Sequence, residues 1–414
     1  MKFLHIADLH FGKSVHGVSL LENGDQTAWV QCFLRLAEGV KPDAVVVAGD
    51  VYDRSAPSGD AVALLDCLLT ALAERHIPVM MIAGNHDSGQ RLSFGGSLLA
   101  RQNIYIAGVL SKELTHVTLP DPDGHGPVTF WLMPYIFPAL AAQVLEDEDI
   151  RDYDTAVRKL LAAQNVDFTQ RNVIVAHQNV TENGAEALRG GSESMVGGVG
   201  QVDYTAFDGF DYAALGHIHA AYHVGRASVR YAGSPLCYHF SETRQPAKGP
   251  VLVELGVKGE EPKIQTCLIP PLHPMREVKG SWEQLRDSEL GQARENEYLR
   301  IVLTDRRISP EIAGFFRGLC ENRGSILMEI ASEYDPFREV SSAHPGQAQT
   351  EKSVEELFSD FYEARNDGTA PEEDDLALLH FAGEHVRHAQ STGEQDADGV
   401  EILLQFIMEQ EAEV

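Results

Sequence analysis

The chain has 414 residues, 43% hydrophobic and 23% charged, which is enough for one large domain and one or two small ones. Its formal net charge of -29 excludes a broadly basic, DNA-coating surface, so a polyanionic partner would need metal ions or another subunit. The five cysteines form no CxxC pair, the N-terminus becomes polar too early for a signal peptide, and no apolar run reaches membrane length, so we expect a cytoplasmic protein without a membrane partner.

Residues 1–270 alternate short apolar runs with helical patterns, which is typical of an α/β domain. The runs are rich in Val, Ile and Leu and predict buried strands at KFLHIAD, DAVVVAGD, PVMMIAGN, VTFWLMP, NVIVAHQ, YAALGH, VRYAGSP and GPVLVEL. Crossover helices between the first three runs are predicted from apolar residues at helical spacing, at Val30, Phe33, Leu34 and Ala37 and at Val62, Leu65, Leu69 and Leu72. Alternation alone would predict one doubly wound sheet.

A Pro-rich segment, IPPLHP, marks a boundary near residue 270. Beyond it, residues 271–340 predict a small α/β domain with strands at MREVKG, EYLRIVLTD and SILMEI and helices near Trp282 to Leu290 and Pro310 to Leu319. Residues 341–414 are predicted to be a polar linker and acidic amphipathic helices, the first with apolar residues at Val354, Leu357, Phe358, Phe361 and Tyr362.

Side chains that can bind metal follow the predicted strands of the first domain, where α/β sheets usually place their ligands. In chain order they are Asp8 and His10; Asp50 and Asp53; Asn85, His86 and Asp87; His177; and His217 and His219. In an extended segment residues i and i+2 point the same way, so both ligands of a D-x-H or H-x-H motif reach one site. Carboxylate and amide oxygens with imidazole nitrogens suit Mn²⁺, Fe or Zn²⁺. The spacing favours two ions, which about 3.5–4 Å apart would share a bridging carboxylate.

Each motif also has an ordinary interpretation when it stands alone. A single His-x-His is most often coincidence, and GDxxD or NHD most often satisfies the backbone of a turn. Coincidence does not account for five such motifs in order, each directly after an apolar run. The sequence therefore predicts a two-metal centre.

The order of these motifs resembles that of the calcineurin-like metallophosphoesterases. It appears as DLH from Asp8, GDVYD from Gly49, GNHD from Gly84, AHQ around His177 and GHIH from Gly216. The resemblance spans the first two-thirds of the chain. It implies a double β-sandwich flanked by helices in place of the doubly wound sheet, with a small α/β cap domain and C-terminal helices.

Within that superfamily the chain is similar to the nuclease subunits of bacterial SbcC–SbcD-type complexes, in the segments KFLHIADLHFGK, AGDVYDRSAPS, AGNHDS, YAALGHIH, VRYAGSP and SVEELFSDFYE. This resemblance implies a DNA exonuclease and endonuclease of DNA repair, recombination and replication that uses two Mn²⁺ ions. Residues 271–340 would be a DNA-binding cap. The C-terminal helices would dock on an SbcC-type coiled-coil ATPase, and the nuclease would form a homodimer within a heterotetramer.

The resemblance also implies a role for each residue of the motifs. The ligands of one ion would be Asp8, His10 and His219, and those of the other Asn85, His177 and His217, with Asp50 bridging. His86 would contact the scissile phosphate and protonate the leaving oxygen, as suits an imidazole. Asp87 would orient His86 or the turn, while Asp53 either supports His10 or the phosphate or begins a helix.

Three functions remain open from the sequence. The first is the ATPase-partnered DNA nuclease, and the second is a small-molecule phosphodiesterase with the same metals. The third is a non-catalytic scaffold, which the complete ligand set and His86 argue against. The cap could supply a local basic strip, although solvated surface charge explains its cations equally well: Arg276, Lys279, Arg300, Arg306 and Arg307.

Overall fold

The computed structural model describes residues 1–185, 200–245, 248–288 and 291–334, together with residues 359, 362–363 and 370–371. By its contacts the chain divides into two compact units, Met1–Tyr334 and Asp335–Val414. Apart from those last five residues, the predicted linker and C-terminal helices of 341–414 lie outside the described residues. The division into domains 1–270, 271–340 and 341–414 stays a prediction.

The first of two six-stranded sheets has the order β16-β15-β1-β4-β5-β6. Four central and edge strands run parallel, because helices return the chain across the sheet: β1 Lys2–Ile6, β4 Ala44–Ala48, β5 Val79–Ile82 and β6 Ile104–Ala107. Two strands from the end of the domain add an antiparallel edge, β15 Val251–Glu254 and β16 Lys263–Thr266.

The second sheet has the order β13-β14-β12-β9-β8-β7. Its parallel strands are β8 Val128–Met133, β9 Arg171–His177, β12 Tyr212–Gly216 and β14 Arg226–Tyr231. Antiparallel strands close both edges, β7 Thr115–Leu119 and β13 His223–Val224. All eight apolar runs named from the sequence are strands of these two sheets.

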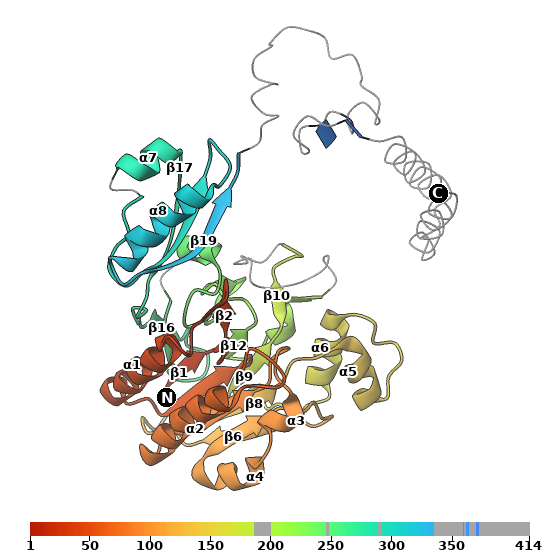
Figure 1. Cartoon of the computed structure of the whole chain (residues 1–414). Helices are drawn as coiled ribbons and strands as arrows, with labels where there is room; N and C mark the ends of the chain where they lie inside the picture. The colour runs from red at the N-terminus through yellow and green to blue at the C-terminus, as the bar shows by residue number, and fades with distance from the viewer. Residues whose placement is uncertain are drawn as a thin grey trace. The chain divides into compact units, whose positions relative to one another are not determined.

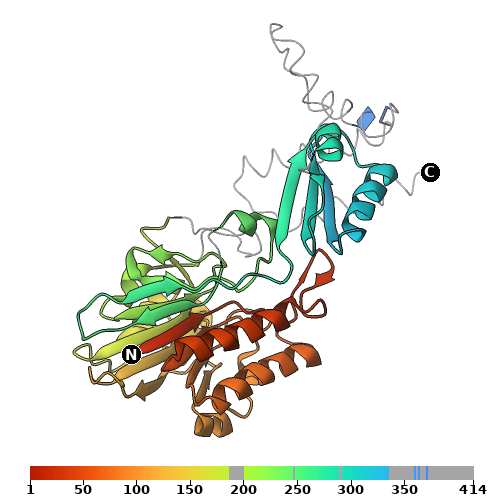
Figure 2. The ribbon, with the colours of Figure 1, turned by 90° about the vertical axis from the view of Figure 1, so that its left-hand side faces the viewer.

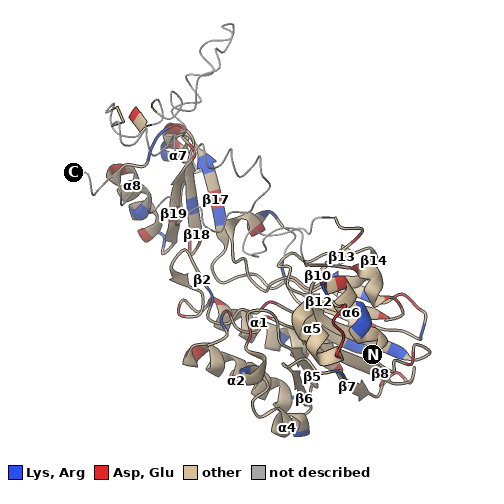
Figure 3. Ribbon diagram, turned by 90° about the vertical axis from the view of Figure 1, so that its right-hand side faces the viewer, with Lys and Arg blue, Asp and Glu red and all other residues tan. Residues whose placement is uncertain are grey.

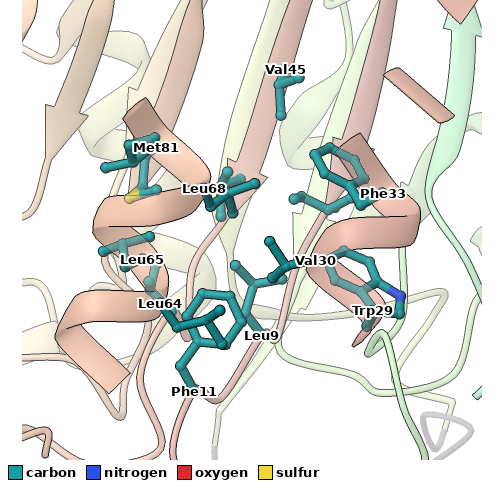
Figure 4. Packing of buried hydrophobic residues seen from close by; sticks show 14 of the residues in the cluster. Leu9, Phe11, Trp29, Val30, Phe33, Val45, Leu64, Leu65, Leu68 and Met81 are labelled. Atoms are coloured by element: carbon teal, nitrogen blue, oxygen red, sulfur yellow. The ribbon is translucent and has the colours of Figure 1, made fainter. Parts of the chain in front are cut away.

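Helices cover the outer faces of the two sheets, while the inner faces pack on each other. Phe3, Met80 and Phe130 belong to the core between the sheets. Outside the first sheet lie α1 Asp25–Val40 and α2 Gly59–Glu74 (Figures 1 and 2), which bury Trp29, Phe33, Leu65 and Leu68 (Figure 4). Outside the second sheet lie α5 Pro138–Leu145 and α6 Tyr153–Ala162.

This arrangement confirms the double β-sandwich flanked by helices, and the single doubly wound sheet was wrong. Strands of both sheets are buried on two faces, so they read alike as continuous apolar runs. The amino-acid pattern therefore cannot tell whether eight such strands lie in one sheet or two. In α2 the predicted apolar positions Leu65, Leu69 and Leu72 are buried, whereas Val62 is 46% exposed.

Residues 275–332 form a small parallel sheet with the order β17-β18-β19. Its elements are β17 Met275–Gly280, α7 Trp282–Asp287, β18 Tyr298–Leu303, α8 Pro310–Glu321 and β19 Ile326–Ser332. Phe316 and Leu285 fill its core beneath the sheet. Asp25 at the start of α1 joins it to the sandwich, because Tyr298 Oη donates to Asp25 Oδ2 at 2.5 Å and His273 Nδ1 lies 3.0 Å from Asp25 Oδ1.

Several short elements connect these layers. They are β2 Ser14–Val15, β3 Val18–Ser19, α3 Gly89–Leu92, α4 Gly96–Leu99, η1 Ala100–Gln102, β10 Asn179–Thr181, β11 Gln201–Asp203, η2 Tyr204–Phe207 and η3 Phe240–Arg244. The Gly-rich stretch Ser192 to Tyr204 lies mostly outside the described residues. Among the residues that are described, no helix has the length and apolar character needed to cross a membrane.

Candidate metal centre

The predicted ligands meet where the carboxyl ends of strands from both sheets come together. Asp8 follows β1, Asp50 follows β4 and Asn85 follows β5, all in the first sheet, while His177 ends β9 and His217 follows β12 in the second. Backbone hydrogen bonds hold the first two loops together, from Asp8 N to Gly49 O at 3.0 Å and from His10 N to Asp50 O at 2.9 Å. The centre is thus built across the sandwich.

Three groups of potential ligand atoms lie within 4.8 Å of one another among the described residues. They are Asp8, His10 and His219; His10, Asp50 and His86; and Asp8, Asp50 and His177. Asp50 belongs to two of the groups, with Oδ2 3.5 Å from His10 Nε2 and 3.4 Å from His177 Nε2. That central position is the one a bridging carboxylate requires.

The backbone is strained at the ligands themselves. Asp8, His10, Asp50 and His217 all have positive φ, at 54°, 44°, 48° and 102°. Such angles are uncommon for residues with a Cβ and are kept only where the surrounding fold imposes them. The turns therefore aim these side chains into the centre at a cost in backbone energy.

Glycines let the two sheets approach closely around the ligands. A Cβ on Gly84 would lie 2.1 Å from Asp50 Oδ1, and one on Gly216 would lie 1.9 Å from Ala48 O. Both distances are far below van der Waals contact. The glycines of the GNHD and GHIH motifs are thus required by packing.

Several buried polar atoms of the centre have no hydrogen-bond partner within the described residues. They are Asp8 Oδ2 and both ring nitrogens of His10. Asp8 and His10 are at most 1% exposed. Burying such atoms unpaired is costly, on the order of 1–3 kcal/mol each, and a bound cation would remove that cost. The residues present therefore fit divalent metal.

His177 is oriented so that one ring nitrogen is left for a cation. Its Nδ1 lies 2.8 Å from the carbonyl oxygen of Ala48 on the facing sheet, which is the partner expected for an Nδ1–H donor. Its Nε2 lies 3.1 Å from Asn85 Oδ1, and the same oxygen lies 3.1 Å from His217 Nδ1. Asn85, His177 and His217 thus converge on one point, as the second ligand set requires.

Burial and charge shift the pKa values of these groups in opposite directions. Burial raises the pKa of Asp8 to about 7. For His177, burial alone would lower the pKa, but the charge of Asp50 outweighs it and raises the pKa to about 9. For Asp50, burial is opposed by His177 and His10, which hold its pKa well below the usual value. Asp50 is therefore the carboxylate that stays ionised in the centre.

Glu242, on η3, supports the centre and was not foreseen from the sequence. Its buried Oε1 lies 3.2 Å from His219 Nδ1, and its Oε2 forms a 3.0 Å ion pair with Lys248 Nζ. A carboxylate on one ring nitrogen orients a histidine and makes the other nitrogen a better ligand. Glu242 lies 23 residues after His219 with no motif around it, so no sequence signal pointed to it.

His86 lies beside the ligands and is held at two points. Its backbone N–H donates to Asp50 Oδ1 at 2.9 Å, and its Nδ1 lies 2.9 Å from the backbone oxygen of Asp53. With Nδ1 occupied by that carbonyl, Nε2 is the nitrogen available for proton transfer. The ring is partly exposed and packs edge-on against His10 with centroids 4.8 Å apart.

Asp87 and Asp53 have structural roles at the edge of the centre. The Asp87 carboxylate accepts hydrogen bonds from the backbone N–H groups of Gly84, Val51 and Tyr52, so it holds the turn. The Asp53 carboxylate accepts from Lys13 Nζ at 2.7 Å and lies 3.7 Å from His10 Nδ1. It does not begin a helix, because the N-cap of α2 is Ser58.

Family models match both parts of the described chain. Residues 1–221, more than half of the chain, match the calcineurin-like phosphoesterase model, and residues 271–366 match the model described as the type 5 capsule protein repressor C-terminal domain. The chain therefore belongs to the calcineurin-like phosphoesterases, which are metal-dependent hydrolases of phosphoesters. This confirms the predicted superfamily and enzyme class.

Curated relatives narrow the family further. Two proteins named as the SbcD component of the SbcCD nuclease match, one of Staphylococcus saprophyticus subsp. saprophyticus at 34% identity over 73% of this chain and 78% of its own, the other of Staphylococcus epidermidis at 31% identity over 87% and 98%. The chain belongs to the SbcD family, as its motifs predicted. Among solved structures, the crystal structure of TT1561 of Thermus thermophilus matches with a TM-score of 0.36 at 12% identity, over 64% of this chain and 98% of that one.

Proposed function

We propose that the protein is a Mn²⁺-dependent DNA nuclease that hydrolyses phosphodiesters by a two-metal mechanism, as an exonuclease on duplex ends and an endonuclease on single strands and hairpins. One observation carries the proposal: oxygen and imidazole ligands from five separate loops converge around Asp50, with buried atoms of Asp8 and His10 left unpaired. The name of the staphylococcal relatives supports the choice of nucleic acid as substrate.

In this proposal each ion has three ligands of its own. Asp8, His10 and His219 would hold one, Asn85, His177 and His217 the other, and Asp50 would bridge. The three-residue group Asp8, His10 and His219 and the contacts of Asn85 with both His177 and His217 support this division. Ligand sets of oxygen and imidazole without cysteine suit Mn²⁺.

The residues around the ions would divide the chemistry among them. When bound, two divalent cations supply Lewis-acid stabilisation of the charge that develops on the phosphoryl group. His86, fixed through Nδ1 by the Asp53 carbonyl, would give the proton on Nε2 to the leaving oxygen. No side chain is required as a nucleophile. Such general acid catalysis contributes roughly 100- to 10,000-fold.

We propose two protein partners and one nucleic acid. The C-terminal helices of 341–414 would dock on an SbcC-type coiled-coil ATPase, consistent with the complex in the name of the relatives. The homodimer would form over an apolar groove of about 610 Å³ beside α2, where Val62 and Phe94 are 46% and 87% exposed. DNA would be held at the metal centre and the cap.

The alternative is a small-molecule phosphodiesterase, since the metal centre alone does not define the substrate. The deciding experiment is Mn²⁺-dependent cleavage of an end-labelled hairpin duplex by the full chain, beside His86→Ala and an EDTA blank. We expect cleavage by the wild type, and loss of turnover with Mn²⁺ still bound in His86→Ala. His125→Ala, at an exposed position outside the centre, is the matched control.

Two results would decide against the proposal. A wild type that binds Mn²⁺ and hydrolyses bis(p-nitrophenyl) phosphate but leaves the hairpin intact would favour the small diester. A His86→Ala enzyme of normal rate would remove His86 from the mechanism while leaving the nuclease assignment in place.

A further inference from the structure

An aromatic cluster adjoins the metal centre on the side of the second ligand set. The ring of Tyr135, just after β8, lies 6.0 Å from that of His177 and 6.1 Å from that of His217, measured between centroids. Phe137 packs edge-on against Tyr135 at 4.8 Å, and Tyr153 lies 6.3 Å from Tyr135. None of the five metal-binding motifs includes these three aromatic residues.

Phe137 is placed where local structure does not account for it. It is the N-cap of α5, a position that favours Ser, Thr, Asp or Asn, and its side chain makes no capping hydrogen bond. Its ring is 51% exposed, and Leu140, one turn further along α5, is 38% exposed. An apolar surface thus runs outward from the ligand histidines through Tyr135 to Phe137.

The surroundings indicate what kind of group would cover this surface. A phosphodiester bound at the metal centre carries its substituents past Tyr135, and in DNA the substituent next to each phosphate is a flat base. Every nucleobase has an aromatic face, and aromatic side chains that stack on bases are the usual way to hold single strands without reading sequence. A chain with a net charge of -29 has all the more need of an apolar contact to the substrate.

We infer that Phe137, backed by Tyr135, forms a stacking subsite for the unpaired nucleobase next to the phosphodiester that is cleaved. The inference rests on the proposed nuclease function and specifies its substrate. A base stacked on Phe137 has left its duplex neighbours, so the subsite selects single strands, hairpin loops and frayed ends over intact duplex.

The test compares a base-bearing strand with the same strand lacking bases. The full-length wild type, Phe137→Ala and Phe137→Trp would be assayed with Mn²⁺ on an end-labelled oligothymidylate and on an oligomer of equal length built from tetrahydrofuran abasic units. Phe168→Ala is the matched control, because Phe168 is 45% exposed and lies before β9, at the opposite end of that strand from His177.

We expect Phe137→Ala to lower kcat/KM on oligothymidylate by roughly 5- to 150-fold, the loss typical of one base–aromatic stack. The abasic oligomer should be cleaved equally by the wild type and Phe137→Ala, and more slowly than oligothymidylate by the wild type. Phe137→Trp should restore the rate, and Phe168→Ala should leave it unchanged.

Two results would overturn the subsite alone: equal oligothymidylate cleavage by Phe137→Ala and the wild type, or an equal loss on both oligomers. The second would mean that Phe137 supports the metal centre rather than a base. A wild type that turns over bis(p-nitrophenyl) phosphate and cleaves neither oligomer would instead overturn the nuclease proposal, and the subsite with it.

Discussion

The metal centre and the cap both concentrate ionisable side chains, but they place them in opposite surroundings. In the centre, Asp8, His10 and Asp50 are buried, adopt positive φ and leave polar atoms without partners in the described residues. On the cap sheet, charges of both signs lie side by side (Figure 3) and form ion pairs: Arg276–Glu297, Lys279–Glu333, Arg300–Glu277, Arg300–Glu329 and Arg306–Asp305.

This difference separates charges kept for a ligand from charges that neutralise each other. Unpaired buried groups cost stability, and a fold retains them where something else binds them. Paired surface groups contribute little stability and present little net field. Four of the five cations that suggested a basic strip on the cap, Arg276, Lys279, Arg300 and Arg306, therefore do not form a free phosphate-binding surface in this structure.

The largest effect is expected from breaking the centre at its shared carboxylate. Asp50→Ala removes the group that contacts both ligand sets, so both ions should be lost and activity should fall on the order of 1000-fold or more. Calorimetric titration with Mn²⁺ and the hairpin assay measure the two effects. Asp66→Ala, on the exposed face of α2, is the control, and Mn²⁺ binding by Asp50→Ala at wild-type affinity would contradict the assignment.

Glu242 sharpens the comparison, because it is a buried carboxylate that is paired and still serves the centre. Glu242→Gln should weaken Mn²⁺ binding at the Asp8, His10 and His219 site by roughly 10- to 100-fold. Lys248→Met breaks the same buried ion pair but keeps the Glu242–His219 contact. Both variants should therefore unfold more easily, but only Glu242→Gln should bind Mn²⁺ more weakly. Equal affinities in the two variants would reduce Glu242 to a purely structural role.

His5 provides a buried histidine that is outside the ligand sets. It packs within β1 with Nδ1 3.1 Å from Tyr212 Oη, and burial lowers its pKa from 6.5 to about 3. Below pH 6.5 the unfolded chain binds a proton that the folded chain excludes, so stability falls as pH drops toward about 3, by up to about 1.4 kcal/mol per pH unit. Denaturant titrations of EDTA-treated protein at several pH values measure this slope, which His5→Gln should lower.

The smallest effect is expected on the cap. Arg300 is 26% exposed and pairs with Glu277 and Glu329, so Arg300→Gln should change stability by no more than about 1–2 kcal/mol after solvent screening. Thermal unfolding measures the change, and Mn²⁺ affinity should stay at the wild-type value. A loss of DNA affinity as large as that of a phosphate-contacting arginine would show that the ion pairs open to receive DNA.

The sequence by itself determined the strands and the ligand residues. Continuous Val- and Ile-rich runs such as those of β4 and β9 form strands because few other elements bury so short an apolar segment on both faces. Asp8, His10 and Asn85 stand directly after such runs, so their position at the carboxyl ends of strands could be read in one dimension. The i, i+2 spacing carried the rest of that prediction.

Only the tertiary structure decided which distant groups support those ligands. Two sheets in place of one, the contact of Glu242 with His219, the carbonyl of Ala48 on His177 and the placement of Phe137 beside Tyr135 all depend on packing. The cap shows the same limit in reverse, since Arg300 looks like a free cation in sequence and is neutralised by two carboxylates on neighbouring strands. Local spacing records which residues share a strand end, whereas partners across layers are set by the shape of the whole fold.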